Sequence, residues 1–389
     1  MSLRTCIGRE PSGAAISVEF GERIESVSAW TGEAPAQWLS PGWVDIQVNG
    51  YAGADYCSPH TTLEDATHSV EVLWSTGVTR FFPTVITGSR EGMAGAIANL
   101  AKLKAAMPLH GKSMVGFHIE GPHISPVEGP RGAHPESAVR PPDIDELKSW
   151  IDLSHGQIKL VTVAPEWPGA ASYIEFAASR GIVIAIGHTM ADSAQIAAAV
   201  SAGATMSTHL GNGAHATIRR HPNYIWDQLA DDRLAASFIA DGIHLPAAFL
   251  KVALRAKGVE RSVMTTDAVM PAGCRPGRYR LGEVDVELHD DDRVTLVGKD
   301  KLAGSSLRMD RGVENLMRLG EVSFGQAIAM SSRNPARCGR IEGRCQGLAP
   351  GELGDLLELD FDAAAISVRV RSVYLEGENV YRADRADSN

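Results

Sequence analysis

The chain has 389 residues, a formal net charge of −10, 44% hydrophobic residues and 22% charged residues. This composition is ordinary for a folded globular protein and excludes extensive disorder. The negative charge, without any lysine- or arginine-rich run, argues against binding to nucleic acid or to an anionic membrane. The sequence contains no stretch of about 18 apolar residues, so no membrane-spanning helix is predicted.

The cysteines and the N-terminus favour a cytoplasmic location. The N-terminus has no apolar segment of secretory type. The cysteines are odd in number, scattered and without paired zinc-finger spacing, which is typical of reduced thiols. They are Cys6, Cys57, Cys274, Cys338 and Cys345.

Residues 40–344 show a regular alternation that residues 1–39 lack. Short apolar runs rich in β-formers alternate with longer segments of helical period, which is the pattern of βα units around a parallel sheet. Eight such runs predict a closed (β/α)₈ barrel, an α/β fold. They lie near Trp43–Val48, Arg80–Thr84, Met114–Ile119, Ile158–Val163, Ile182–Ile186, Thr205–Thr208, Ala235–Ala240 and Ser262–Thr266.

The segments between and after these runs complete the predicted architecture. Asp143 to Glu146 predicts an N-cap with a capping box, and Asp192–Ala202 predicts a helix that Gly203 ends. A β-hairpin insertion is expected near residues 275–300. Residues 345–389 contain two further strand patterns, and we expect them to form a small β-sandwich domain together with residues 1–39.

Polar side chains follow nearly every predicted barrel strand. In a barrel these positions share one face, so a common site is expected there. They are Gln47, Asn49, His118, Glu120, Glu166, His188, His209, Asn212, Asp241, His244 and Asp267.

The residue types at these positions suit a catalytic metal. Glu120, His188 and His209 would leave a fourth tetrahedral position open for water, and Asp267 could accept a proton from that water. Each residue also has a simpler interpretation: strand-end histidines often only bond to a loop, and Glu120 or Asp267 could cap a turn. Their joint placement favours the metal site and hydrolysis of an amide or ester.

The motifs from residue 40 to 336 resemble the N-acetylglucosamine-6-phosphate deacetylase family of the amidohydrolase superfamily. The similar segments keep the order of that family. They are Pro41–Gly50, His118–Pro122, Gly132–His134, Ala164–Glu166, Gly187–Thr189, Thr208–Leu210, Ala240–His244, Thr266–Ala268, Leu302–Ser305 and Asn334–Ala336.

The resemblance implies roles for individual residues. Glu120, His188 and His209 would hold one divalent ion per subunit, with Zn²⁺ expected and Fe²⁺ or another ion as alternatives. Asp267 would act as general base and then as acid, and His134 would polarise the acetyl carbonyl. Many relatives bind a second metal with His-x-His after the first strand, but here Gln47 and Asn49 leave that position vacant.

The resemblance also implies a substrate and a partner. Asn212, Gly213 and His244 match positions that contact the sugar or its phosphate, and Arg219 and Arg220 lie near an expected phosphate-binding arginine. A solvated basic turn is the alternative for these two arginines. Family members are commonly homodimers in which the neighbouring subunit supplies part of the phosphate pocket.

Three functions therefore compete. The leading hypothesis is deacetylation of N-acetylglucosamine-6-phosphate, or a related N-acetyl-hexosamine-6-phosphate, in amino-sugar catabolism. The second is an amidohydrolase that acts on a different, non-phosphorylated N-acyl substrate. The third is a catalytically silent barrel that serves as a scaffold, although silent relatives usually lose metal ligands that this chain retains.

Overall fold

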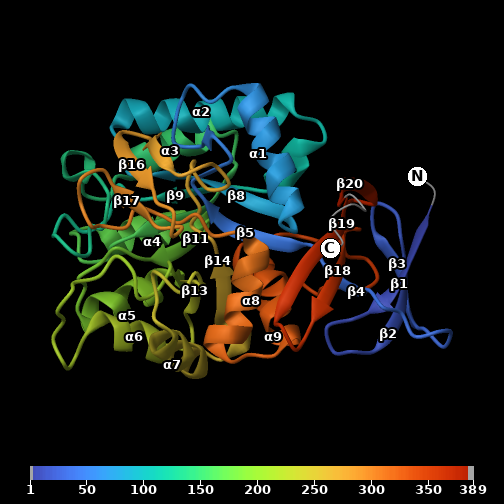
Figure 1. Ribbon diagram of the computed structural model, residues 1–389. Helices are drawn as coiled ribbons and strands as arrows, with labels where there is room; N and C mark the ends of the chain where they lie inside the picture. Colours follow the sequence, from blue (N-terminus) through green and yellow to red (C-terminus); the bar gives the residue numbers. More distant parts are fainter. Residues whose placement is uncertain (1–2, 384–389) are drawn as a thin grey trace.

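Eight parallel strands form the centre of the computed structural model, which describes residues 3–383 (Figure 1). Backbone hydrogen bonds join the two ends of the series: Asp267 N donates to Gln47 O over 3.0 Å, and Asn49 N donates to Ala268 O over 2.7 Å. The predicted barrel is confirmed. Its strands are β5 (Trp43–Val48), β8 (Val78–Ile86), β9 (Phe117–Glu120), β10 (Ile158–Val163), β11 (Val183–Ile186), β12 (Ala204–Ser207), β13 (Ala235–Ile239) and β14 (Ser262–Thr265).

Alternate side chains of these strands fill the barrel and contact the surrounding helices. Val44 and Ile46 of β5 join Val183 of β11 in one buried cluster inside the barrel. Trp43 is the neighbour of Val44 in β5, and Ile184 is the neighbour of Val183 in β11. Both point outward and belong to the larger cluster that includes residues of the helices. This alternation follows from the two-residue period of a strand.

Helices surround the barrel, and most begin at a polar capping residue. Asp192 forms a capping box with Gln195, and Gly203 ends that helix in the left-handed conformation with φ of 119°, as the sequence predicts. The α-helices are α1 (Leu63–Ser75), α2 (Arg90–Ala106), α3 (Ile144–Leu153), α4 (Ala170–Ser179), α5 (Ser193–Ala202), α6 (Tyr224–Ala230), α7 (Ala247–Lys257), α8 (Met309–Gly320), α9 (Phe324–Ser331) and α10 (Arg333–Cys338). The 3₁₀ helices are η1 (His110–Ser113), η2 (Glu136–Ala138) and η3 (Val259–Arg261). No helix in residues 3–383 is long and apolar enough to cross a membrane.

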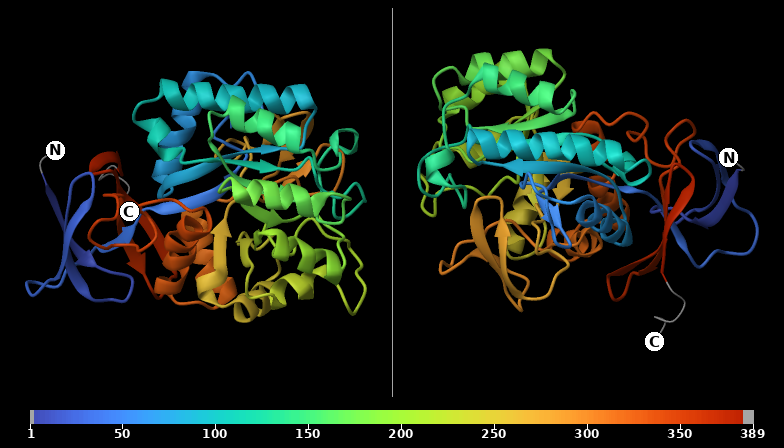
Figure 2. Two further views of the ribbon diagram at one scale, coloured as in Figure 1. Left: turned by 180° about the vertical axis from the view of Figure 1, so that it is seen from behind. Right: turned by 90° about the horizontal axis from the view of Figure 1, so that it is seen from above.

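Both ends of the chain contribute to one seven-stranded sheet beside the barrel (Figures 1 and 2). Phe20 and Tyr374 meet edge to face in its core, with ring centroids 5.2 Å apart. The predicted second β domain is confirmed, whereas its boundaries at residues 39 and 345 stay a prediction. The strand order is β20 (Glu378–Arg382), β19 (Ser367–Leu375), β18 (Leu356–Asp362), β4 (Trp38–Pro41), β1 (Arg4–Arg9), β2 (Ala15–Phe20) and β3 (Ile24–Ala29).

The predicted insertion is a three-stranded antiparallel sheet. Its strands are β15 (Gly277–Leu281), β16 (Val284–Leu288) and β17 (Val294–Leu296). Leu281, Val286 and Val294 pack in one apolar cluster with Val269 and Ala303, which lie on loops at the barrel mouth. The insertion therefore forms part of that mouth. The remaining strands, β6 (Gly50–Tyr51) and β7 (Ala54–Asp55), pair beside it in the loop after β5.

A buried ion-pair network connects the barrel to the second sheet. Arg80 of β8 donates from Nε to Asp355 Oδ2 over 2.6 Å and from Nη2 to Glu376 Oε1 over 3.0 Å. Arg344 Nε lies 3.3 Å from the same Asp355 oxygen. Burial alone would raise the pKa of Asp355, but the charges of Arg80 and Arg344 outweigh burial and hold it below its ordinary value.

We predict that Asp355→Asn lowers the free energy of unfolding by about 3 kcal/mol at pH 7, because it leaves Arg80 and Arg344 buried without their counter-ion. The pKa of Asp355 is lower in the folded state, so this stabilisation is present above about pH 4 and is lost as the pH falls through the folded-state pKa. Denaturant unfolding followed by circular dichroism measures it. Asp360→Asn is the control, because Asp360 pairs with Arg371 at the surface of the same sheet. Equal unfolding midpoints for the two variants would contradict the prediction.

Candidate metal centre and substrate cavity

Four polar side chains project from the carboxyl ends of barrel strands into one cavity. Glu120 is the last residue of β9, and His188, His209 and Asp267 each follow their strand by two residues. The three that follow a strand have positive φ angles of 49°, 27° and 53°. Such angles are uncommon for residues other than glycine and cluster at functional sites.

Glu120, His188 and His209 bring three potential metal ligands together. Glu120 Oε1 lies 2.7 Å from His209 Nε2 and 3.3 Å from His188 Nε2, and the two Nε2 atoms are 3.2 Å apart. Ligands of a tetrahedral zinc ion, with bonds of about 2 Å, stand about 3.3 Å from one another. A carboxylate with two imidazoles at this spacing fits a divalent metal ion.

The surroundings of this cluster fix its protonation and orientation. His188 Nδ1 donates to the carbonyl oxygen of Pro130 over 2.8 Å, which orients the ring so that Nε2 faces Glu120. Burial of Glu120 would raise its pKa, but hydrogen bonds from His188 and His209 lower it well below the ordinary value. The carboxylate therefore stays ionised.

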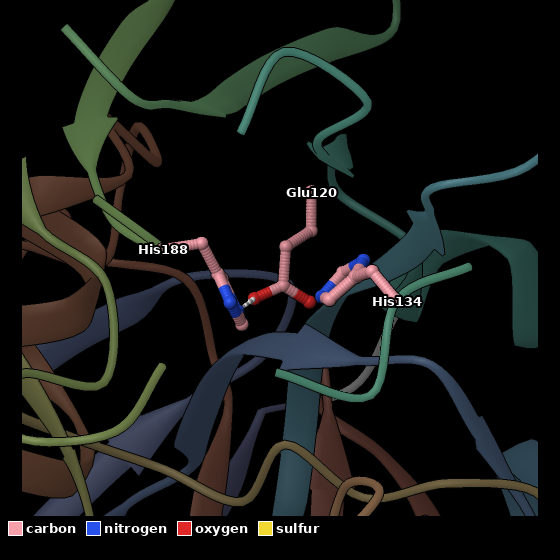
Figure 3. Close-up of side chains that lie close together, drawn as sticks. All are labelled: Glu120, His134 and His188. Atoms are coloured by element: carbon pink, nitrogen blue, oxygen red, sulfur yellow. Dashed lines mark hydrogen bonds and ion pairs between the residues drawn. The ribbon is translucent and has the colours of Figure 1, made fainter. Parts of the chain in front are cut away.

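His134 lies against the same cluster. Figure 3 shows Glu120 between His134 and His188, and ligand atoms of these three residues lie within 4.8 Å of one another. Two trios of potential metal ligands therefore share Glu120 and His188. The third ligand is His209 in one trio and His134 in the other. The shorter distances favour His209. Burial lowers the pKa of His134 to about 3, so its ring is neutral, and its Nδ1 lies 2.8 Å from Thr87 Oγ1.

Gln47 and Asn49 hold Asp267. Gln47 Nε2 and Asn49 Nδ2 donate to Asp267 Oδ1 over 2.9 and 2.6 Å. Burial, together with the charge of Glu120, raises the pKa of Asp267 to about 7. A carboxyl group with such a pKa can exchange a proton near neutral pH, as a general base or acid must.

The cavity around these groups has a volume of about 210 Å³. His244 lines it and is oriented by Asp241, whose Oδ2 lies 2.6 Å from His244 Nδ1. Asn212 Nδ2 donates to the carbonyl oxygen of His209 over 3.1 Å. Gly213 has φ of 55°, and a Cβ atom there would come within 2.6 Å of His188 Nδ1. Glycine is therefore required at this position.

Arg219 and Arg220 do not line this cavity. Both are exposed, and their carbonyl oxygens accept hydrogen bonds from Asn223 Nδ2 over 3.1 and 3.2 Å. Arg219 borders a neighbouring hollow beside α6. Glu166, which also follows a strand, binds Thr189 Oγ1 and Met190 N and does not line the cavity either.

The sequence did not indicate several cavity residues. Ile86, Leu281 and Val284 form an apolar wall, two of them from the insertion, and Lys301 adds a cation. The position of Lys301 directly before the Leu302–Ser305 motif was the available signal.

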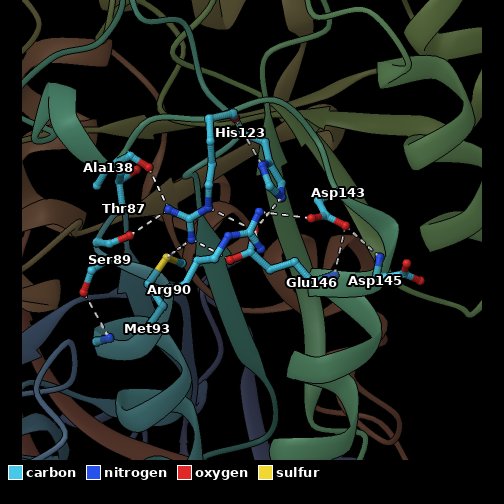
Figure 4. Close-up of polar contacts among 12 residues, drawn as sticks. Thr87, Ser89, Arg90, Met93, His123, Ala138, Asp143, Asp145 and Glu146 are labelled. Atoms are coloured by element: carbon cyan, nitrogen blue, oxygen red, sulfur yellow. Dashed lines mark hydrogen bonds and ion pairs between the residues drawn. The ribbon is translucent and has the colours of Figure 1, made fainter.

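A polar network anchors the loop that carries His134 (Figure 4). Glu146 of α3 lies 3.0 Å from Arg140 Nε and 3.1 Å from Arg90 Nη1. Asp143 caps α3 by accepting from the backbone N–H groups of Asp145 and Glu146. The predicted capping box is therefore only half formed, because the Glu146 side chain binds the two arginines.

A Glu/His/His cluster and an aspartate at the mouth of a (β/α)₈ barrel define a metal-dependent hydrolase of the amidohydrolase type. The model of the Amidohydrolase family matches residues 38–380. The chain is 33% identical over 341 residues to N-acetylglucosamine-6-phosphate deacetylase of Bacillus subtilis (strain 168), covering 86% of this chain and 84% of the relative. It is 31% identical to N-acetylgalactosamine-6-phosphate deacetylase of Escherichia coli O157:H7, covering 91% of each chain.

Solved structures of deacetylases from this family have the same fold as this chain. The crystal structure of N-acetyl-D-glucosamine-6-phosphate deacetylase from Mycobacterium smegmatis superposes with a TM-score of 0.86 at 29% identity, covering 94% of this chain and 96% of that chain. The chain belongs to the N-acetylglucosamine-6-phosphate deacetylase family of amidohydrolases.

Proposed function

We propose that this protein deacetylates N-acetylglucosamine-6-phosphate, or a closely related N-acetyl-hexosamine-6-phosphate, giving acetate and the amino-sugar phosphate in amino-sugar catabolism. The observation that carries the proposal is the convergence of Glu120, His188 and His209 beside Asp267, whose pKa is raised to about 7. Relatives named for the glucosamine and the galactosamine substrates are similarly identical, so either epimer fits.

The metal site takes one divalent ion, held by Glu120, His188 and His209. We assign Zn²⁺, with Fe²⁺ or another divalent ion as the alternative. When bound, the ion lowers the pKa of water to about 7 and polarises a carbonyl oxygen. Gln47 and Asn49 leave the second-metal position vacant because both amides donate to Asp267.

The protein's own groups move the protons and stabilise charge. Asp267 takes a proton from the attacking water and returns it to the amine nitrogen as the C–N bond breaks. His134 is neutral, and Thr87 bonded at Nδ1 leaves Nε2–H to donate to the acyl oxygen as negative charge develops there. Asn212, Gly213 and His244 contact the sugar and its phosphate.

The proposal includes a homodimer. Arg219 and Arg220 lie outside the cavity of their own subunit, so we propose that they bind phosphate in the cavity of a second copy. Arginine suits this role because its planar fork donates to two phosphate oxygens. Met190 and Ile218, exposed around the same hollow as Arg219, would be covered by that copy. The five free thiols support a cytoplasmic location.

The exposed arginines also keep a second function open. If Arg219 and Arg220 bind phosphate neither in their own cavity nor in that of a second copy, the cavity could take a non-phosphorylated N-acyl substrate. A silent scaffold is less well supported, since every group needed for hydrolysis is in place.

We predict that the metal-loaded protein releases acetate from N-acetylglucosamine-6-phosphate with a kcat/KM at least about 100-fold above that for N-acetylglucosamine, because phosphate adds charge-assisted hydrogen bonds. Asp267→Asn should lower kcat by about 10²- to 10⁴-fold with its metal content unchanged. Coupled acetate assays and elemental analysis measure both. No acetate from either sugar would move the substrate to another N-acyl compound, and unchanged turnover would remove Asp267 from the mechanism.

The dimer is tested by complementation between two inactive variants. Asp267→Asn is paired with the double variant Arg219→Met/Arg220→Met, and the mixed dimer is purified through two different tags. One of its two cavities then has Asp267 and receives intact arginines from the other subunit. We predict about half of the wild-type turnover per dimer. Arginines acting within their own subunit would give no gain over the two homodimers.

A further inference from the structure

The active-site cavity is lined by the lysine side chain of Lys301. Among the described residues that line it, Lys301 is the only lysine or arginine. The same cavity contains the carboxyl groups of Glu120 and Asp267. Imidazoles, amides and the proposed metal ion balance these two carboxyl groups, so among the described residues of the cavity Lys301 is the lysine or arginine left to pair with an anionic group of the substrate.

Lys301 is held by a partner that can release it. Its Nζ atom lies 2.6 Å from Glu128 Oε1, across the cavity mouth on the loop after β9. Glu128 is 70% exposed, and its other oxygen accepts from Arg131 Nη2 over 2.7 Å. Exposed ion pairs contribute little stability because water screens them. Glu128 also keeps Arg131 when Lys301 leaves.

We propose that Lys301 binds the anionic group of the substrate, and that this group displaces Glu128. Under the proposed function, on which this inference rests, the group is the sugar phosphate. A phosphate monoester carries a charge of about −1.5 to −2 at pH 7, and lysine binds it as a mobile point charge. Phosphate has three free oxygens, so Lys301 can act together with an arginine from the second copy.

The test compares Lys301→Met with Lys299→Met, a control at an exposed lysine that does not line the cavity. Lys301→Met should raise KM for N-acetylglucosamine-6-phosphate by about 10- to 100-fold, with kcat nearly unchanged. It should leave kcat/KM for unphosphorylated N-acetylglucosamine unchanged. Lys301→Arg should recover part of the loss, and Lys299→Met should behave as wild type.

Glu128→Gln distinguishes a role of Lys301 in substrate binding from a purely structural role, in which its ion pair with Glu128 holds the two loops together. If Lys301 binds the substrate, this variant keeps or lowers KM, because it removes a competitor for the ammonium group. Equal increases of KM in Glu128→Gln and Lys301→Met would overturn the inference. An equal loss of kcat/KM for both sugars in Lys301→Met would also overturn it.

A failure of the proposed function remains distinguishable from a failure of this inference. If the wild-type protein releases acetate from neither sugar, calorimetric titration with inorganic phosphate decides. Binding at least about 10-fold tighter to wild type than to Lys301→Met supports Lys301 as the anion site. Equal affinities overturn it.

Discussion

The structure depends on the closure of the barrel, because closure alone brings the ends of distant strands to one point. Glu120, His188, His209 and Asp267 come from four strands, and each is buried beside the others. Buried charges must be compensated. Glu120 is compensated by two imidazoles and Asp267 by two amides, and a divalent ion would complete the balance.

The same closure explains why Gln47 and Asn49 contact Asp267. β5 and β14 meet at the seam of the barrel, so side chains that end the first strand face the residue that follows the last. Amides donate to a carboxylate where imidazoles would bind metal. Loops complete the cavity that the strand ends begin. The insertion supplies part of its apolar wall, and Lys301 supplies a positive charge.

The sequence predicted the barrel well because its strands are short apolar runs that end in polar residues. It also placed the metal-site candidates, since strand ends of a barrel share one face. It could not place Arg219 and Arg220, whose positions depend on the path of an exposed loop. Glu146 shows the same limit: a local capping pattern competes with Arg90 and Arg140, and only tertiary contact decides. The partner of Lys301 was equally invisible, because Glu128 is distant in the chain.

Anomalous diffraction from crystals of the zinc-loaded protein tests the central claim most directly. The account predicts one peak per subunit, about 2 Å from a Glu120 oxygen and from Nε2 of His188 and His209, with none beside Gln47 and Asn49. A single ion bound by His134 in place of His209, or a second ion at Gln47 and Asn49, would contradict it.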